Sequence, residues 1–328
     1  MSLRVLFIGG NGIISSASSS RLIQRGDELT LLNRGTSRVR PAIEGARHLT
    51  GDAADEASIA AAIGDATFDV VVNFRAFTPG QVERDVRLFE GRCRQYVYIS
   101  SASAYQKPVA RLPITESTPL RNPFWQYSRD KIASEDVLVA AYRERGFPMT
   151  IIRPSHTYDA TSVPLLGGWT AIDRMRRGLP VVVHGDGTSL WTMTHTRDFA
   201  VALTGLLGND RAVGEAFHIT SDEVLTWTQL FELLARAAGA EFRPVHISSE
   251  AIARELPDEG PGLLGDKAHS VIFDNAKVKA LVPEYRAVIP FWRGAQEMVD
   301  WHDAEESRRV VDRELDASFD RLIERYGA

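Results

Sequence analysis

The sequence predicts an α/β fold, in which helices cover both faces of a doubly wound parallel sheet, with a smaller and mostly C-terminal second domain. In the first half, short apolar runs alternate strictly with amphipathic stretches, a pattern typical of parallel sheets. The chain of 328 residues is also long for one hydrophobic core. We therefore expect a larger domain at residues 1–158 and about 188–225, and a smaller one at about 159–187 and 226–328.

The elements follow in order. Apolar and β-branched runs predict strands, and a period near 3.6 between them predicts helices. The first half gives strands at 4–8, 28–32, 68–73, 95–100 and 149–153, and helices from the first glycine turn to about 24, at 80–89 and at 126–144. The second half gives strands at 181–183 and 217–220, a helix at 226–238, and a solvated amphipathic helix over 304–326.

Composition narrows the class of function. A net charge of -5 and a pI near 5.9 argue against a nucleic acid or an anionic membrane as the main partner. We find no apolar run of roughly 18 residues and no secretory signal pattern, so we expect a cytoplasmic protein. The single cysteine, Cys93, excludes an intramolecular disulfide, and no His, Asp and Glu set has the spacing of a metal site.

A glycine-rich turn follows the first strand and opens the first helix. Gly9, Asn11, Gly12 and Ile13 lie there, and such glycines let backbone N–H groups approach a pyrophosphate at the positive end of a helix. We therefore predict a nucleotide phosphate site of the Rossmann type. The third glycine position of the usual motif holds Ser15, so the packing there has to accommodate a hydroxyl.

The end of the second strand predicts which dinucleotide is bound. Asn33 stands where an acidic residue would accept a hydrogen bond from the ribose of NAD, and Arg34 and Arg38 follow it. Two guanidinium groups suit a 2′-phosphate, which favours NADP over NAD. The alternative is that both arginines face water. Asp52, where a third strand would end, is placed to meet the adenine amine.

A tyrosine and a lysine four positions apart form the candidate catalytic pair. Tyr127 and Lys131 would lie on one face of a helix, where the cation lowers the pKa of the phenol and makes it an acid/base for an alcohol. Ser100 ends a predicted strand and Ser101 and Ser103 follow it, at the edge of the sheet where ligands bind. Alone, each of these patterns also fits a solvated helix face or an ordinary turn.

Taken together, the motifs occur in the order and spacing of a known family. They are Gly9-x-x-Gly12, Ser101, Tyr127-x-x-x-Lys131, Ile152-Arg153-Pro154, Gly185-Asp186-Gly187, His195-Thr196-Arg197-Asp198, Phe217-His218-Ile219 and Asp274-Asn275-Ala276-Lys277. In these the sequence resembles the extended short-chain dehydrogenases/reductases, the NAD(P)-dependent sugar epimerase/dehydratase group. The resemblance extends to about residue 302.

The resemblance implies a role for each matched residue. Tyr127 would be the acid/base, Lys131 would hold the nicotinamide ribose, and Ser101 would hydrogen-bond the reacting oxygen. Further cofactor contacts would come from Asn73, Phe74, Ser100, Pro154 and His156. The family also implies a homodimer through the helices around 81–89 and 127–142.

Three departures from the family pattern restrict the substrate. Ala102-Ser103 replaces the Asp-Glu pair of the 4,6-dehydratases, so dehydration is disfavoured. Trp191-Thr192 replaces the arginine that clamps a substrate diphosphate; Trp191 would stack on the substrate or fill the core. Arg75 would reach a phosphate or the substrate, or point outward. A basic cluster could supply the missing charge but is more simply a solvated helix face: Arg174, Arg176 and Arg177.

The sequence supports two hypotheses. The first is an NAD(P)-dependent oxidoreductase or epimerase that transfers hydride to or from a secondary alcohol or ketone of a sugar-like substrate. Candidate substrate contacts are Ser103, Arg75 and Trp191. The second is a non-catalytic dinucleotide sensor or RNA-associated protein on the same fold.

Overall fold

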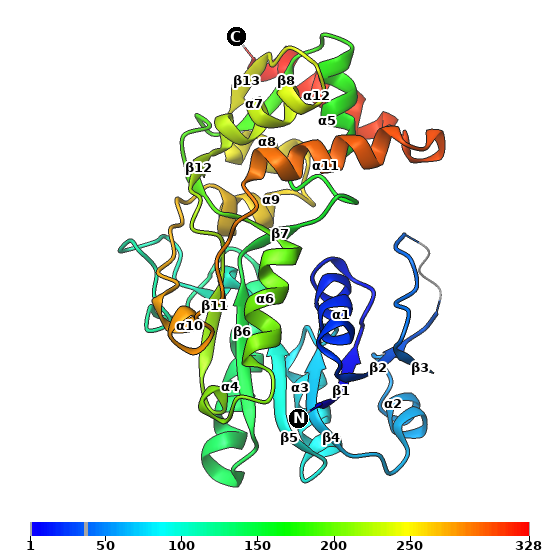
Figure 1. Ribbon diagram of the computed structural model, residues 1–328. Coiled ribbons are helices and arrows are strands. Elements are labelled where there is room, and N and C mark those ends of the chain that lie inside the picture. The colour runs from blue at the N-terminus through cyan, green and yellow to red at the C-terminus, as the bar shows by residue number, and fades with distance from the viewer. Residues whose placement is uncertain (1, 36–38, 328) are drawn as a thin grey trace.

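The computed structural model describes residues 2–35 and 39–327 (Figure 1). Its central sheet has seven strands in the order β3-β2-β1-β4-β5-β6-β11, and all neighbours are parallel. The chain leaves β1 to one side and returns at β4 on the other, which creates a crevice at the carboxyl ends of these strands. The predicted Rossmann-type α/β fold is confirmed. The strands are β1 (Arg4–Ile8), β2 (Glu28–Asn33), β3 (Arg47–Thr50), β4 (Phe68–Asn73), β5 (Cys93–Ile99), β6 (Met149–Pro154) and β11 (Ala216–Ile219).

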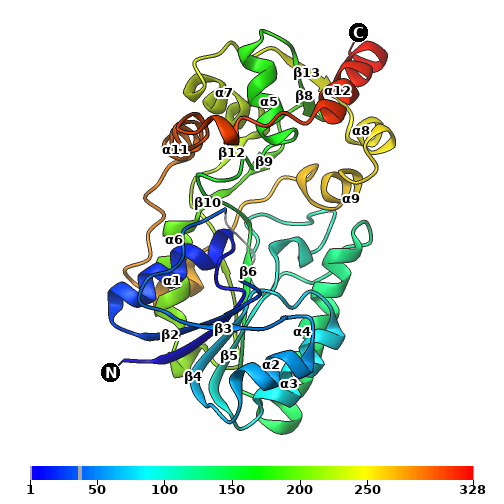
Figure 2. The same cartoon turned by 90° about the vertical axis from the view of Figure 1, so that its right-hand side faces the viewer.

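Helices cover both faces of this sheet. Side chains alternate along β1, so Val5 and Phe7 pack into one core and Leu6 and Ile8 into another. The first core lies under α1 (Ile13–Arg25) and α6 (Thr196–Leu206), with α10 (Ala276–Leu281) beside them. The second lies under α2 (Glu56–Ile63), α3 (Pro79–Phe89) and α4 (Gln126–Arg145). Figure 2 shows the two groups on opposite sides of the sheet.

The remaining elements form a second layer above the carboxyl ends of the strands, which we call the cap (Figure 1). Its core is built around Trp191, Trp227 and Phe231. The strand β8 (Val181–His184) pairs with β13 (Pro244–Ile247) in parallel. The helices of the cap are α5 (Gly168–Arg176), α7 (Trp227–Ala237), α8 (Ser249–Glu255), α9 (Gly260–Gly262), the π-helical turn η3 (Leu263–Lys267), α11 (Phe291–Asp303) and α12 (Arg313–Tyr326).

Short elements connect the cap to the sheet. The strand β7 (His156–Tyr158) pairs with β10 (Met193–His195), and β9 (Leu190–Trp191) pairs with β12 (Leu225–Thr226). Three short 3-10 turns complete the described chain: η1 (Ala102–Ala104), η2 (Asp210–Ala212) and η4 (Glu306–Arg308). Within the described residues, no helix is both long and apolar enough to cross a membrane.

Two expectations about the cap are wrong. The last helix begins at Arg313, not near 304, because the Asp312 carboxylate accepts hydrogen bonds from the first N–H groups of the helix. Arg174 is not part of a solvated face, since only 1% of it is exposed. Its guanidinium donates to Asp316 at 2.6 Å and to Asp320 at 2.8 Å, so α12 supplies the counter-charges that the sequence pattern could not reveal.

Candidate active site

The glycine turn is held open by geometry that a side chain would disturb. Gly9 has φ +91°, and a Cβ placed there would lie 2.4 Å from Cγ of Arg75. Ser15 provides a brace within the same turn. Its hydroxyl accepts a hydrogen bond from the Gly12 N–H at 2.7 Å and donates to the Gly9 carbonyl at 2.9 Å. The serine at the third glycine position is therefore accommodated by satisfying its hydroxyl inside the turn.

A cavity of about 440 Å³ opens beside this turn, and we call it the loop cavity. It collects the ends of β1, β2 and β3 and the segment after β4. Its walls are Gly9, Asn11, Gly12, Leu32, Asn33, Arg34, Gly35, Arg40, Gly51, Asp52, Ala53, Ala54, Arg75, Phe77 and Gln81.

The loop cavity fits the adenosine and phosphate half of a dinucleotide. Among the described residues, Asn11 Oδ1 and Asn33 Nδ2 are buried and have no hydrogen-bond partner, so each is available to a ligand. No acidic side chain occupies the first turn of α1, which leaves the positive end of its dipole open to a phosphate. The Asp52 carboxylate lines the same cavity.

The arginines near this cavity differ in their freedom to bind a ligand. Arg34 is exposed and lines the cavity, whereas Arg38 lies outside the described residues. Arg40 was not predicted. It also lines the cavity, but its guanidinium is paired with the Asp159 carboxylate at 2.8 and 3.1 Å. Arg75 lies in the loop cavity, with its guanidinium 5.3 Å from the ring centroid of Phe77 and away from the predicted substrate site.

Two further cavities continue from the loop cavity toward the cap. The central cavity, about 270 Å³, is lined by Ile14, Phe74, Phe77, Ile99, Ser100, Ser101, Tyr127, Lys131, Pro154, Ser155, His156 and Thr157. The cap cavity, about 240 Å³, is lined by Ser101, Ala102, Ser103, Trp125, Tyr127, Pro154, Ser155, His156, Asp266, Lys267, Val271 and Phe273. Phe77 is common to the first two cavities, and Tyr127 and Ser101 are common to the last two.

Lys131 is buried beneath the central cavity. Its ammonium donates to the carbonyl oxygens of Ala76 and Ile99, both at 2.8 Å, and lies 5.6 Å from the ring centroid of Tyr127. Burial lowers the pKa of Lys131 to about 7, against the opposing charge of Glu135. The predicted neighbourhood of Tyr127 and Lys131 on one helix face is present.

The predicted lowering of the pKa of the phenol is wrong. Burial raises the pKa of Tyr127, although the nearby Ser101 hydroxyl acts in the opposite direction; the Asp266 carboxylate raises it further. Because the ammonium of Lys131 points to two backbone carbonyls, it does not lower this pKa. The neutral phenol is therefore the resting form.

The three serines after β5 have different partners. Ser101 Oγ lies 2.9 Å from Ser103 Oγ and accepts from the Ser103 N–H at 3.1 Å. The hydroxyl of Ser103 accepts a hydrogen bond from Ser128 at 2.8 Å, and Ser103 lines the cap cavity. Ser100 donates to Glu135 at 2.5 Å. Ser101 is thus the serine that lies beside Tyr127 on both cavities.

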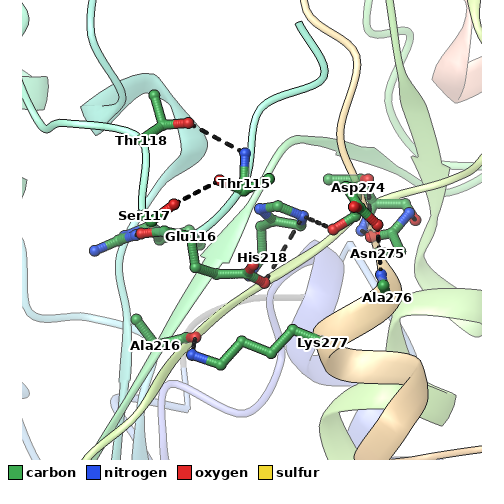
Figure 3. A network of polar contacts seen from close by, with 12 residues as sticks. Thr115, Glu116, Ser117, Thr118, Ala216, His218, Asp274, Asn275, Ala276 and Lys277 are labelled. Atoms are coloured by element: carbon green, nitrogen blue, oxygen red, sulfur yellow. Dashed lines mark hydrogen bonds and ion pairs between the residues drawn. The ribbon is translucent and has the colours of Figure 1, made fainter.

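A buried polar network supports the floor of the site. Glu135 accepts from Arg153 at 2.6 Å, and both side chains are less than one tenth exposed. Arg153 also donates to Tyr105 at 3.2 Å, and Tyr105 lies 3.1 Å from Nδ1 of His218. Figure 3 shows the far end, where His218 Nε2 donates to the Asp274 carbonyl at 2.7 Å and lies 3.7 Å from Glu116. The sequence singled out Arg153 within a motif but missed Glu135.

Three predicted site residues lie away from the cavity walls. Asn73 is fully buried and shapes the turn after β4, where its Oδ1 accepts from the Arg75 N–H at 2.7 Å. Ile13 begins α1, and its neighbour Ile14 lines the central cavity instead. Trp191 is 2% exposed and packs 5.0 Å from the ring of Trp227, so it fills the cap core.

His156 lines both the central and the cap cavity. Burial lowers its pKa to about 3, and the positive charge of Lys267 acts in the same direction. Its imidazole is therefore neutral near neutral pH and cannot supply a charge to a substrate. Within residues 2–35 and 39–327, no group of three His, Cys, Asp or Glu side chains could hold a metal ion.

The parallel sheet, the glycine turn and the line of three cavities define a Rossmann-type protein built like the extended short-chain dehydrogenases/reductases. The chain belongs to the NAD dependent epimerase/dehydratase family, whose model matches residues 5–220. The sequence resemblance is thereby confirmed.

The individual proteins to which the chain is similar share only a modest part of its sequence. The chain is 28% identical to 2'-dehydrokanamycin reductase of Streptomyces kanamyceticus over 291 residues, which is 87% of this chain and 80% of the reductase. It is 27% identical to the chloroplast stem-loop binding protein of 41 kDa b of Arabidopsis thaliana over 72% of this chain, and spans 63% of that protein. UDP-glucose 4-epimerase of Bifidobacterium longum, solved with NAD+ and UDP, superposes with a TM-score of 0.74 at 16% identity, over 93% of this chain and 99% of the epimerase. This last likeness shows the fold alone.

Proposed function

We propose that the protein is an NAD(P)-dependent oxidoreductase or epimerase that transfers hydride to or from a secondary alcohol or ketone of a sugar-like substrate. The observation that carries this proposal is the position of Tyr127 and Ser101, which line the central cavity and the cap cavity at once. A proton donor for a substrate that meets the nicotinamide where these two cavities join has to lie on their shared wall.

The residues of the chain supply the proton and the positions. When bound, the nicotinamide supplies or accepts the hydride. In the reducing direction, the phenol of Tyr127 gives its proton to the oxygen that becomes the alcohol, and Ser101 donates a hydrogen bond to the same oxygen. The raised pKa of Tyr127 suits this direction because the phenol is protonated. Lys131, which lies beneath the central cavity with its ammonium 5.6 Å from the ring, would hold the nicotinamide ribose.

The loop and central cavities would hold the cofactor. We assign cofactor contacts to the residues that both the sequence and the cavities support: Gly9, Asn11, Gly12, Asn33, Arg34, Asp52, Phe74, Ser100, Pro154 and His156. Arg34 supports a preference for NADP because its guanidinium is exposed at the cavity wall. The cap, together with Ser103, would form the substrate-binding domain, with boundaries near 158, 188 and 225.

Mass spectrometry of the dinucleotide that co-purifies separates the open alternatives. Tightly held NAD would indicate an epimerase, which returns the hydride to the same substrate, and would contradict the proposed role of Arg34. NADP that exchanges freely would indicate a reductase.

Replacement of Tyr127 by phenylalanine tests the mechanism. The variant lacks the proton donor but keeps the ring, which packs 4.8 Å from Trp125. We expect hydride transfer to fall by about 10²–10⁴-fold, the usual range for a general acid, while dinucleotide affinity measured by fluorescence titration stays within about twofold. Lys131→Arg serves as a companion variant to Tyr127→Phe, since it keeps the positive charge at position 131. Full turnover in Tyr127→Phe would refute the mechanism.

A non-catalytic, RNA-associated role is the second candidate. The likeness to a stem-loop binding protein favours it, whereas the net charge of -5 opposes it. Titration of an RNA hairpin at two salt concentrations distinguishes the candidates, because phosphate contacts make affinity fall steeply as salt rises. Steeply salt-dependent binding would support this role.

We further propose a homodimer through α3 and α4. Tyr142 of α4 is 40% exposed and is a candidate contact. Light scattering on the purified protein measures the mass of the assembly. The cytoplasmic location stays a prediction from the sequence.

A further inference from the structure

The turn η3 is fixed against the segment that leads into the Tyr127 helix. Gly265 of this turn has no room for a side chain, since an added Cβ would lie 2.9 Å from Cβ of Trp125. Asn122 Nδ2 donates to the Gly265 carbonyl at 2.7 Å. Residues more than a hundred positions apart are thereby held together, and the end of η3 lines the cap cavity together with Tyr127.

The backbone at Lys267, the last residue of η3, is held from the other side. Its carbonyl lies within hydrogen-bond distance of Trp227 Nε1 at 3.1 Å, Ser189 Oγ at 3.3 Å and His184 Nε2 at 3.3 Å. Three donors on one oxygen fix the position from which the lysine side chain projects. A π-helical turn is rare and frequently occurs at functional sites.

The two charged residues of η3 that line the cap cavity differ in whether their charge is neutralised. Asp266 is neutralised by the buried ammonium of Lys107 at 3.2 Å. Within residues 2–35 and 39–327, the ammonium of Lys267 forms no hydrogen bond and no ion pair with a carboxylate. It lies beside Gly262, where an added Cβ would come within 3.2 Å of Nζ, so the missing side chain leaves it room. The cap cavity therefore has one uncompensated positive charge.

We propose that Lys267 binds an anionic group of the substrate, so that the substrate is a sugar-like alcohol or ketone that also bears a carboxylate or a phosphate. This inference rests on the proposed function. A partly enclosed cation attracts a counter-charge and rejects a second cation. Since Tyr127 and Lys267 line the same cavity, one substrate could present its reacting carbon near Tyr127 and its anion to Lys267. Trp191 cannot provide this charge because it is buried in the cap core.

Matched sugars test the proposal by binding. The protein, saturated with oxidised dinucleotide, is titrated with D-glucose, D-glucuronate and D-glucose 6-phosphate, and binding is followed by saturation-transfer NMR. We expect at least one anionic sugar to bind about tenfold more tightly than glucose, which corresponds to about 1.4 kcal/mol. The two anions separate a carboxylate site from a phosphate site.

Variants test whether Lys267 is the residue that causes the preference for the anion. Lys267→Gln should abolish the preference for the anion, and Lys267→Arg should retain it. Both keep the backbone carbonyl that anchors η3. Lys279→Gln makes the same change of charge on α10, where Lys279 pairs with Asp222 at 2.7 Å, and should change nothing. Equal binding of neutral and anionic sugars, no binding of either anion, or a preference that survives Lys267→Gln would overturn the proposal.

The outcome of the binding test does not depend on whether the protein transfers hydride. Binding is measured without turnover, and Tyr127→Phe should keep the preference for the anion. Absence of hydride transfer in the unmodified protein, or full hydride transfer in Tyr127→Phe, together with an intact preference for the anion would count against the proposed chemistry alone. Hydride transfer that occurs with an equal preference for neutral and anionic sugars would count against the anion site alone.

Discussion

The loop cavity and the cap cavity are built in different ways. The walls of the loop cavity lie between Gly9 and Gln81 and come from consecutive strand ends. Those of the cap cavity come from four separate segments between Ser101 and Phe273. The first is thus a local consequence of the β-α order, while the second depends on how the cap docks onto the sheet. The loop cavity should accordingly respond to changes in its own turn, and the cap cavity to changes in distant contacts.

The largest effect is expected in the buried network next to the central cavity, which Ser100 lines. Glu135→Gln removes the charge that neutralises Arg153, and both side chains are buried. Breaking a buried ion pair on one side costs about 3–5 kcal/mol. We expect that loss in the free energy of unfolding measured by urea denaturation, together with weaker dinucleotide binding, since Ser100 donates to the same carboxylate.

An exposed ion pair provides the control for this variant. Glu90 pairs with Arg145 at 3.3 Å, and both are about half exposed. Glu90→Gln should therefore change stability by no more than about 0.5 kcal/mol. Equal losses in the two variants would show that the buried network does not support the site.

Two glycines test whether the cavities respond separately. Gly9→Ala forces a side chain into a backbone with φ +91° and against Arg75, which costs about 1–3 kcal/mol. We expect dinucleotide affinity to fall about 10- to 100-fold. Gly265→Ala pushes η3 away from Trp125 and should leave dinucleotide affinity within about twofold, while KM for the substrate rises.

Fluorescence titration and steady-state kinetics measure the two effects of this pair. If Gly265→Ala weakened the dinucleotide as much as Gly9→Ala does, the two cavities would form one cooperative unit. The separation between local and distant walls would then be wrong.

The same difference explains what the sequence could predict. The strands and helices of the first half follow from hydrophobic period, and Gly9, Asn33 and Asp52 lie where strand ends place them. Tyr127 and Lys131 were found because a helix fixes their spacing. Asp266 and Lys267 were missed because only the docking of η3 onto Asn122 brings them to Tyr127. Likewise, Arg174 looked solvated because its partners lie on α12.

The smallest effect is expected in the glycine turn beside the loop cavity. Ser15 holds the glycine turn through two hydrogen bonds, and one of them occupies the Gly12 N–H that would otherwise face a phosphate. Ser15→Ala should lower the free energy of unfolding by about 1 kcal/mol, the usual worth of such bonds. Because the Gly12 N–H is released, dinucleotide affinity should stay the same or rise.

Ser18→Ala is the matched control, since its hydroxyl donates to Ile14 within α1, at 2.8 Å and away from the turn. Both variants should lose similar stability in urea, and any rise in dinucleotide affinity should be confined to Ser15→Ala. A fall in affinity for Ser15→Ala would mean that the hydroxyl itself binds the phosphate. The serine would then replace the third glycine as a ligand rather than as a brace of the turn.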